Sequence, residues 1–117
     1  MKKTILLVDD ELIIRLTSGE ILEELGFDVV IASAGTEALE MFSGMYNDIS
    51  LVMLDMTLPD ISGIEVFNSM KQTSPNMKFL LTSGYSQDMT GISDKAAFIQ
   101  KPYSITELSS MIDKLIG

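Results

Sequence analysis

The sequence predicts a single α/β domain built on a doubly wound, five-stranded parallel sheet. Short apolar runs alternate along the chain with longer segments in which apolar residues recur at helical spacing, an order typical of βαβ units. The apolar runs are uninterrupted, as expected for parallel strands that are covered on both faces. The chain has 117 residues, enough for one domain and too few for two. Right-handed crossovers leave two plausible strand orders, and the presence of five strands favours 2-1-3-4-5.

The first part of the chain predicts two strands separated by one helix. The first strand is expected over residues 4–8, immediately before an acidic pair. A helix is expected over residues 11–25, because its apolar residues recur at spacings of three, four and seven, and Gly26 then ends it. β-Branched residues over 28–32 predict the second strand. The residues expected on the inner face of the helix are Ile14, Ile21, Leu22 and Leu25.

The middle of the chain repeats this order. A short helix is expected over residues 36–42, ended by Gly44. Residues 50–54 predict a third strand, which runs directly into Asp55. The helix that follows must end before Pro75. The residues expected to face inward are Leu39 and Phe42 in the first helix and Ile64, Phe67 and Met70 in the second.

The last part predicts two strands and a C-terminal helix. The strands are expected over residues 78–82 and 97–100. The segment 86–97 has the weakest pattern, because Gly91 interrupts any helix, and we expect it to be short and mobile. Ser104 is expected to cap the last helix. The apolar face of that helix consists of Ile105, Leu108, Met111, Ile112 and Leu115.

Composition excludes several kinds of chemistry. The chain has no cysteine and no histidine, which rules out thiol chemistry, disulfides, histidine triads and histidine-ligated metals. The net charge is −9, so direct nucleic-acid binding is not expected. The apolar runs are too short for membrane insertion. No signal peptide or other targeting segment is visible, so we expect a cytoplasmic protein.

Two strands that are predicted to be neighbours both end in acids. Asp9 and Asp10 follow the first strand, and Asp55 follows the third. In a doubly wound sheet, ligands bind where the strand order reverses, which is between these two strands. Each acid alone has a plain structural interpretation, as a helix cap or a turn residue. Together they would repel one another unless a cation intervenes, and Mg²⁺ prefers oxygen ligands of this kind.

The fourth and fifth strands also end in polar residues, Ser83 and Lys101. Taken singly, these are a turn serine and a surface lysine. In the expected strand order, however, both approach Asp55 from the side away from the first strand. A lysine in that position would neutralise carboxylates and bind a phosphoryl oxygen as a point charge. The peptide between Lys101 and Pro102 is a candidate cis peptide, which would aim the lysine inward.

With these residues the chain resembles the receiver domain of bacterial two-component response regulators, over residues 1–117. The resemblance implies a flavodoxin-like receiver fold. The stretches LLTSGYS and KPYSITEL are also similar to receivers fused to hybrid histidine kinases, so the chain is either a free-standing regulator or a piece of a longer protein. The motifs that carry the resemblance are Asp9–Asp10, Asp55 after an apolar strand, the PDISG loop, Ser83 with its following glycine, and Lys101–Pro102.

The resemblance implies a role for each acid. Asp55 would be the phosphoacceptor, receiving a phosphoryl group from a phosphohistidine on a histidine kinase or a histidine phosphotransfer protein. Asp10 and Asp55 would ligate Mg²⁺ directly, together with the backbone carbonyl of Thr57. Asp9 would act mainly through water. The chain would be a signalling phosphoacceptor in a phosphorelay. It would not be an enzyme, except that it would catalyse its own phosphotransfer and dephosphorylation.

The resemblance also implies a switch. Lys101 and the Ser83 hydroxyl would bind phosphoryl oxygens, and Phe98 stands where the family has an aromatic that turns inward on activation. Phosphorylation would draw Ser83 inward, make room for Phe98 and reshape the surface near the fourth and fifth strands. Thr57 and Tyr85 occupy positions that tune the phosphoryl lifetime in the family.

The chemistry of the residues agrees with this reading. An aspartate with an ordinary pKa near ~4 is ionised at neutral pH, so Asp55 can attack phosphorus without a base. Phosphoryl transfer depends on positioning and charge neutralisation, for which Mg²⁺ and Lys101 suffice. Because the chain has no histidine, it cannot be the phosphohistidine donor.

Three other readings compete with this one. The first is a protein-interaction module of the same fold that is never phosphorylated, although all the acids, Ser83 and Lys101 are present. The second is a Mg²⁺-dependent phosphatase with an aspartyl nucleophile, which would carry a second acid where this chain has Thr57. The third is a flavin protein, which the acids after the first strand disfavour because they would repel a phosphate.

Overall fold

The computed structural model describes residues 2–84 and 96–117. Gly91, Tyr85 and most of the weakly patterned segment 86–97 lie outside the described residues. Among the helices of the described part, none has the length and apolarity needed to cross a membrane. The elements in chain order are β1 (Thr4–Val8), α1 (Leu12–Glu24), β2 (Asp28–Ala32), α2 (Gly35–Met45), a 3-10 turn (Tyr46–Asp48), β3 (Ile49–Asp55), α3 (Gly63–Thr73), β4 (Lys78–Ser83), β5 (Ala97–Gln100) and α4 (Ile105–Ile116).

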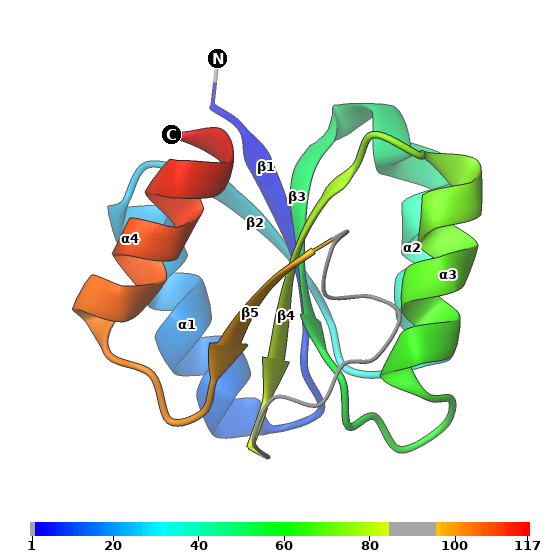
Figure 1. The fold of residues 1–117 in the computed structure, drawn as a ribbon, viewed down its shortest axis with the longest axis horizontal. Helices are drawn as coiled ribbons and strands as arrows, with labels where there is room; N and C mark the ends of the chain where they lie inside the picture. The colour runs from blue at the N-terminus through cyan, green and yellow to red at the C-terminus, as the bar shows by residue number, and fades with distance from the viewer. Residues whose placement is uncertain (1, 85–95) are drawn as a thin grey trace.

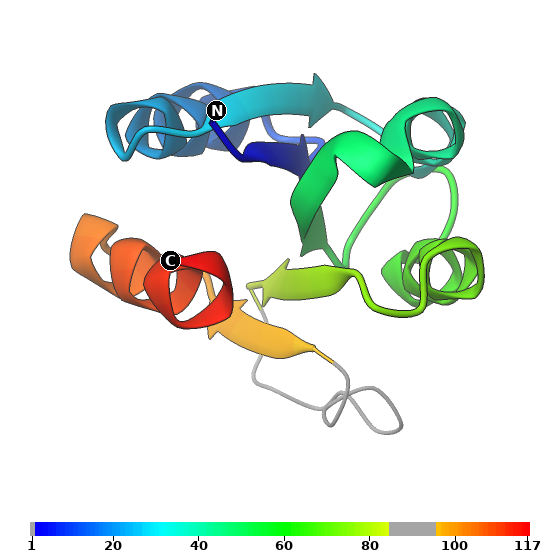
Figure 2. The ribbon, with the colours of Figure 1, turned by 90° about the horizontal axis from the view of Figure 1, so that it is seen from above.

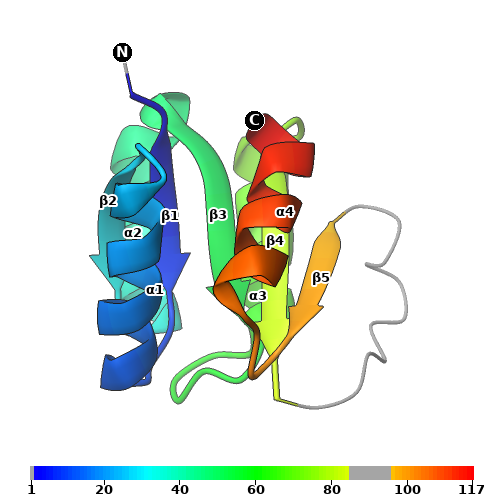
Figure 3. The same ribbon diagram turned by 90° about the vertical axis from the view of Figure 1, so that its left-hand side faces the viewer.

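The five strands form one sheet in the order β2-β1-β3-β4-β5, as predicted (Figure 3). All neighbouring strands are parallel. Helices α1 and α4 cover one face of the sheet, and α2 and α3 cover the other (Figures 1 and 2). The fold is therefore the doubly wound, flavodoxin-like arrangement that the sequence predicts. It brings the carboxyl ends of β1 and β3 side by side, where such sheets bind ligands.

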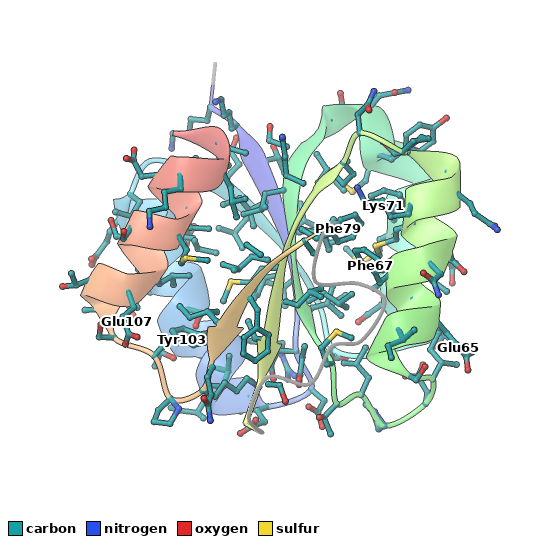
Figure 4. The ribbon with its side chains drawn as sticks, in the orientation of Figure 1. Glu65, Phe67, Lys71, Phe79, Tyr103 and Glu107 are labelled. Carbon is teal, nitrogen blue, oxygen red and sulfur yellow. The ribbon has the colours of Figure 1, made fainter. Side chains whose placement is uncertain are left out.

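The apolar core has two halves, one on each face of the sheet. Strand β3 contributes to both: Leu51 packs with the residues under α1 and α4, and Val52 packs with those under α2 and α3. In the second half, the rings of Phe67 and Phe79 meet edge to face with centroids 4.8 Å apart (Figure 4). Burial on both faces explains the uninterrupted apolar sequence of β3.

Two glycines that were predicted to end helices behave differently. Gly26 has a φ of 99° and follows α1, as expected for a residue that ends a helix in the left-handed region. The prediction for Gly44 is wrong, because α2 continues through it to Met45. Glycine within a helix costs only about 1 kcal/mol relative to alanine, and the packing of the buried Phe42 on the same helix outweighs that cost.

The inner faces of the helices are predicted correctly at their centres and wrongly at their ends. Leu25, Ile64 and Ile105 were expected to face inward but are 40%, 47% and 62% exposed. Leu25 follows the last turn of α1, and the other two lie in the first turns of α3 and α4. An apolar residue at a helix end can therefore have the helical spacing and still not be covered by the sheet. Gly19 of α1 and Val66 of α3 are buried instead.

Candidate functional site

The site lies at the carboxyl edge of the sheet, where two buried acids come from neighbouring strands. Asp9 directly follows β1, and Asp55 is the last residue of β3, one residue later than the predicted end of that strand. Their exposed fractions are only 1% and 2%. Strand pairing places Val8 beside Leu54, so the residues that follow them converge. The sheet register alone therefore brings these two carboxylates together.

Two more acids surround this pair. Asp10 and Glu11 are exposed and follow Asp9 directly. One carboxylate oxygen from each of these three residues and from Asp55 lies within 4.8 Å of the others. Asp10 is thus near Asp55, as predicted, whereas Glu11 was missed. Its place directly after the acidic pair was the available signal, but an acid at the start of a helix is also common without any ligand.

Asp9 is held as a member of the cluster rather than as a helix cap. The N-cap residue of α1 is Glu11, and no side-chain cap bond forms there. Instead the backbone N–H of Glu11 donates to Asp9 Oδ1 at 2.9 Å, and the guanidinium group of Arg15 donates to the Asp9 backbone carbonyl at 2.9 Å. The capping interpretation of Asp9 is therefore wrong, and its second carboxylate oxygen faces the cluster.

Lys101 provides a cation for these acids. Its Nζ lies 2.8 Å from Asp9 Oδ2, 3.2 Å from Glu11 Oε1 and 3.4 Å from Asp55 Oδ2. The backbone N–H of Lys101 donates to the Ser83 carbonyl at 2.7 Å, which joins the ends of β4 and β5. The peptide between Lys101 and Pro102 is cis. One ammonium group therefore contacts three carboxylates, which leaves the cluster strongly negative.

Burial and nearby charges shift the pKa values of Asp55 and Lys101. Burial raises the pKa of Asp55 to about 6, a hydrogen bond from the Thr57 N–H lowers it, and the nearby charge of Asp9 raises it. The ordinary value expected from the sequence is thus too low, although Asp55 is still mostly ionised at neutral pH. Burial lowers the pKa of Lys101, but the hydrogen bond to Asp9 and the charge of Asp55 outweigh it and raise the pKa above its ordinary value. Lys101 therefore remains a cation.

A pocket of about 580 Å³ opens over these groups. Thr57 is exposed at its rim, and its N–H donates to Asp55 Oδ1 at 3.0 Å. Ser83 is buried at the end of β4. Phe98 of β5 is half-buried and packs against the core under α2 and α3. The lining residues are Asp10, Glu11, Ile14, Asp55, Thr57, Gly84, Lys101 and Pro102.

A partly buried hydrogen bond beside the site was also missed in the sequence. The hydroxyl of Tyr103 (labelled in Figure 4) lies 2.7 Å from Ser18 Oγ, and this bond joins the loop after β5 to helix α1. Burial raises the pKa of Tyr103 above its ordinary value. Ser18 and Tyr103 are separated by 85 residues, so no local pattern relates them.

Known proteins match this chain along nearly its whole length. The profile of the response regulator receiver domain matches residues 5–113. Sporulation initiation phosphotransferase F of Bacillus subtilis is 30% identical over 120 residues, covering 99% of this chain and 95% of the relative. Sensor kinase CckA of Brucella abortus is 29% identical, with 97% of this chain covered. The chain spans only 12% of the length of that kinase.

Solved structures agree with this match. The response regulator TrrA of Thermotoga maritima, crystallised in complex with Mg²⁺-BeF, is 35% identical and superposes with a TM-score of 0.85. The match covers 99% of this chain and 100% of that one. Fold, sequence profile and acidic edge thus lead to one conclusion. The chain belongs to the response regulator receiver domain family of two-component systems.

Proposed function

We propose that this receiver accepts a phosphoryl group on Asp55 from a phosphohistidine of a sensor kinase or a histidine phosphotransfer protein, in a Mg²⁺-dependent reaction. The observation that carries the proposal is the surroundings of Asp55. Asp55 is buried and lines an open pocket, and Lys101 Nζ lies 3.4 Å from its carboxylate. A nucleophile and a cation for the incoming phosphoryl group are therefore held together.

The residues of the cluster fit a magnesium ion. Four carboxylates lie within 4.8 Å of one another, and the burial-raised pKa of Asp55 means that a second cation would favour its ionised form. Asp10, Asp55 and the Thr57 carbonyl would be direct ligands, and Asp9 would act through water, because Mg²⁺ keeps several waters and takes few carboxylates. When bound, Mg²⁺ would neutralise charge on the transferring phosphoryl group.

Each side chain has a defined part in the transfer. A carboxylate oxygen of Asp55 forms the new bond to phosphorus while the phosphorus–nitrogen bond of the donor breaks, and the donor nitrogen keeps the electron pair. Asp55 needs no base, because it is mostly ionised at neutral pH. Lys101 and the Ser83 hydroxyl would bind phosphoryl oxygens. The Thr57 N–H, 3.0 Å from Asp55 Oδ1, orients the carboxylate.

We also propose that Ser83 and Phe98 form the switch. Both stand on the β4–β5 side of the sheet: Ser83 pairs with Gln100, and Phe98 pairs with Leu81. Binding of Ser83 to a phosphoryl oxygen would change the packing of the half-buried Phe98 ring against the core. This would alter the surface near β4 and β5 through a local change in charge.

The test is direct. The protein is incubated with Mg²⁺ and acetyl phosphate, and its mass is measured intact. Wild type should gain one phosphoryl group, and Asp55→Asn should gain none. The matched control is Asp113→Asn, a surface aspartate of α4, which should behave as wild type. A wild-type protein that gains nothing with Mg²⁺ and donor would contradict the proposal and favour the interaction module.

A further inference from the structure

Asp60 joins the loop after β3 to the start of helix α2. It lies in the loop over residues 56–62, between β3 and α3. Its carboxylate accepts hydrogen bonds from the Gly35 N–H at 2.9 Å, the Thr36 N–H at 2.8 Å and the Thr36 hydroxyl at 2.7 Å. We call these three bonds the Asp60 link. Asp60 is 25 residues from Gly35 and 24 residues from Thr36 in the chain, so the link joins two distant segments.

The link takes the place of a local helix cap. The N-cap residue of α2 is Ala34, whose side chain cannot cap the helix. The first amides of α2 are therefore satisfied by a carboxylate from another loop, which is also favoured by the positive end of the helix dipole. Hydrogen bonds from Thr36 lower the pKa of Asp60 well below its ordinary range. Asp60 is thus ionised throughout the neutral range.

Two glycines allow the loop to lie this close. A Cβ on Gly35 would stand 2.5 Å from Ile61 Cγ1, and a Cβ on Gly63 would stand 2.5 Å from Met56 Cα. Real Cβ contacts essentially never fall below 3.0 Å, so a side chain at Gly63 would displace the loop backbone at Met56, and one at Gly35 would displace the side chain of Ile61. Ile61 is partly buried against the core under α2 and α3. Close packing and the Asp60 link therefore hold the same loop against α2.

The same loop carries the backbone that borders Asp55. The Met56 N–H donates to the Thr82 carbonyl at 2.9 Å, and the Thr57 N–H donates to Asp55 Oδ1 at 3.0 Å. The Thr57 side chain is exposed, so its own packing does little to fix it. The backbone at Thr57 is held on one side by β4 and on the other by the loop that Asp60 ties to α2.

We propose that Asp60 is a positioning residue for the acidic site. It does not touch the pocket. By fixing the loop to α2 it keeps the Thr57 N–H on Asp55 and keeps the Thr57 carbonyl where it can bind a divalent cation. The role of the Thr57 carbonyl in cation binding rests on the proposed function, whereas the placement of the Thr57 N–H on Asp55 does not. Helix α2, which contributes no residue to the pocket, thereby contributes to its geometry.

The test compares three variants with wild type. Asp60→Ala removes the link. Asp60→Asn keeps one good acceptor and should restore part of the effect. The matched control is Glu37→Ala, which removes hydrogen bonds from the Ser33 N–H and hydroxyl at the start of the same helix and leaves the Asp60 link intact. Two readouts are used: hydrogen exchange of the Thr57 amide in metal-free protein, and the Mg²⁺ dissociation constant by calorimetry.

We expect Asp60→Ala to speed exchange of the Thr57 amide and to raise the Mg²⁺ dissociation constant roughly tenfold, as for the loss of groups that orient metal ligands. Asp60→Asn should fall between Asp60→Ala and wild type, and Glu37→Ala should match wild type. Unchanged Thr57 exchange and Mg²⁺ affinity in Asp60→Ala would overturn the inference. Equal losses in Glu37→Ala would also overturn it, because the effect would then follow from any weakening of α2.

Failure of the proposed function would look different. In that case wild type itself would gain no phosphoryl group from acetyl phosphate. Exchange of the Thr57 amide in metal-free Asp60→Ala would still decide whether Asp60 positions the loop, since that measurement needs neither donor nor metal.

Discussion

The ammonium nitrogen of Lys101 lies 2.8 Å from the buried carboxylate of Asp9. The two residues follow β5 and β1, which are separated in the sheet by β3 and β4. The ion pair therefore spans the ends of β3 and β4, and the same nitrogen lies 3.4 Å from Asp55 Oδ2. Lys101 thus contributes a positive charge to the acidic edge of the sheet, and its removal should leave the carboxylates of Asp9 and Asp55 without this cation.

Lys101→Ala should destabilise the metal-free protein by about 3 kcal/mol, because it leaves buried charges on Asp9 and Asp55 without their cation. Urea unfolding with a chelator present measures this. Lys114→Ala, at an exposed position of α4, is the control and should change stability by less than about 0.5 kcal/mol. Equal stability of the two variants would show that the ion pairs with Lys101 contribute nothing.

Asp55→Asn should stabilise the metal-free protein at neutral pH and lose that advantage in acid. The pKa of Asp55 is about 6 in the folded protein against an ordinary 3.8. Between these values the folded state binds more protons than the unfolded state, so wild-type stability attributable to Asp55 falls as the pH rises from about 4 to about 6. The stability of Asp55→Asn does not fall in this way, because the asparagine side chain does not ionise.

The difference between Asp55→Asn and wild type should therefore grow by up to about 3 kcal/mol from pH 4 to pH 7. Denaturant unfolding of both proteins at several pH values, with chelator present, measures it. Comparing the two proteins at each pH cancels the titration of the other acids. A difference that shrinks as the pH rises would mean that burial does not raise the pKa of Asp55.

Mg²⁺ should raise the thermal stability of wild type in a concentration-dependent way. Binding to the folded state alone adds about 2.7 kcal/mol when the ion is at 100 times its dissociation constant. Asp10→Asn should weaken this response, because it removes a proposed ligand. Melting curves in MgCl₂, matched in ionic strength with NaCl, measure the effect. Stabilisation by NaCl to the same extent would indicate general screening of the net charge instead of a site.

Tyr103→Phe should destabilise the protein by about 1 kcal/mol, since Ser18 Oγ then loses its partner in a buried place. A double-mutant cycle with Ser18→Ala isolates the bond: the two changes together should cost less than the sum of their separate costs. Tyr46→Phe, at a half-buried position on the other side of the sheet, serves as a control. Additive effects at Ser18 and Tyr103 would argue against an energetic role for the bond.

Local patterns in the sequence were enough to predict the fold and most of the site. The apolar run of β3 predicted a strand buried on both faces, and the alternation of strands and helices predicted the strand order that the sheet has. Once that order is known, acids at the ends of β1 and β3 must converge, because parallel strands end at the same edge. The cap at Ser104 was likewise predicted, and the structure shows that Glu107 completes it as a capping box.

The tertiary structure decided what depends on distant neighbours. Ile105 has the right spacing yet is 62% exposed, because a helix end can extend past the sheet. Asp60 looks like a turn residue, and only the packed fold brings it to the amides of α2. The raised pKa of Asp55 follows from burial, which no local pattern measures. The sequence by itself thus determined that Asp9, Asp10, Asp55 and Lys101 reach the acidic edge, because the spacing of apolar residues and the strand order place them at strand ends, whereas Glu11 was missed. Their burial, pairing and support arise from packing between segments far apart in the chain.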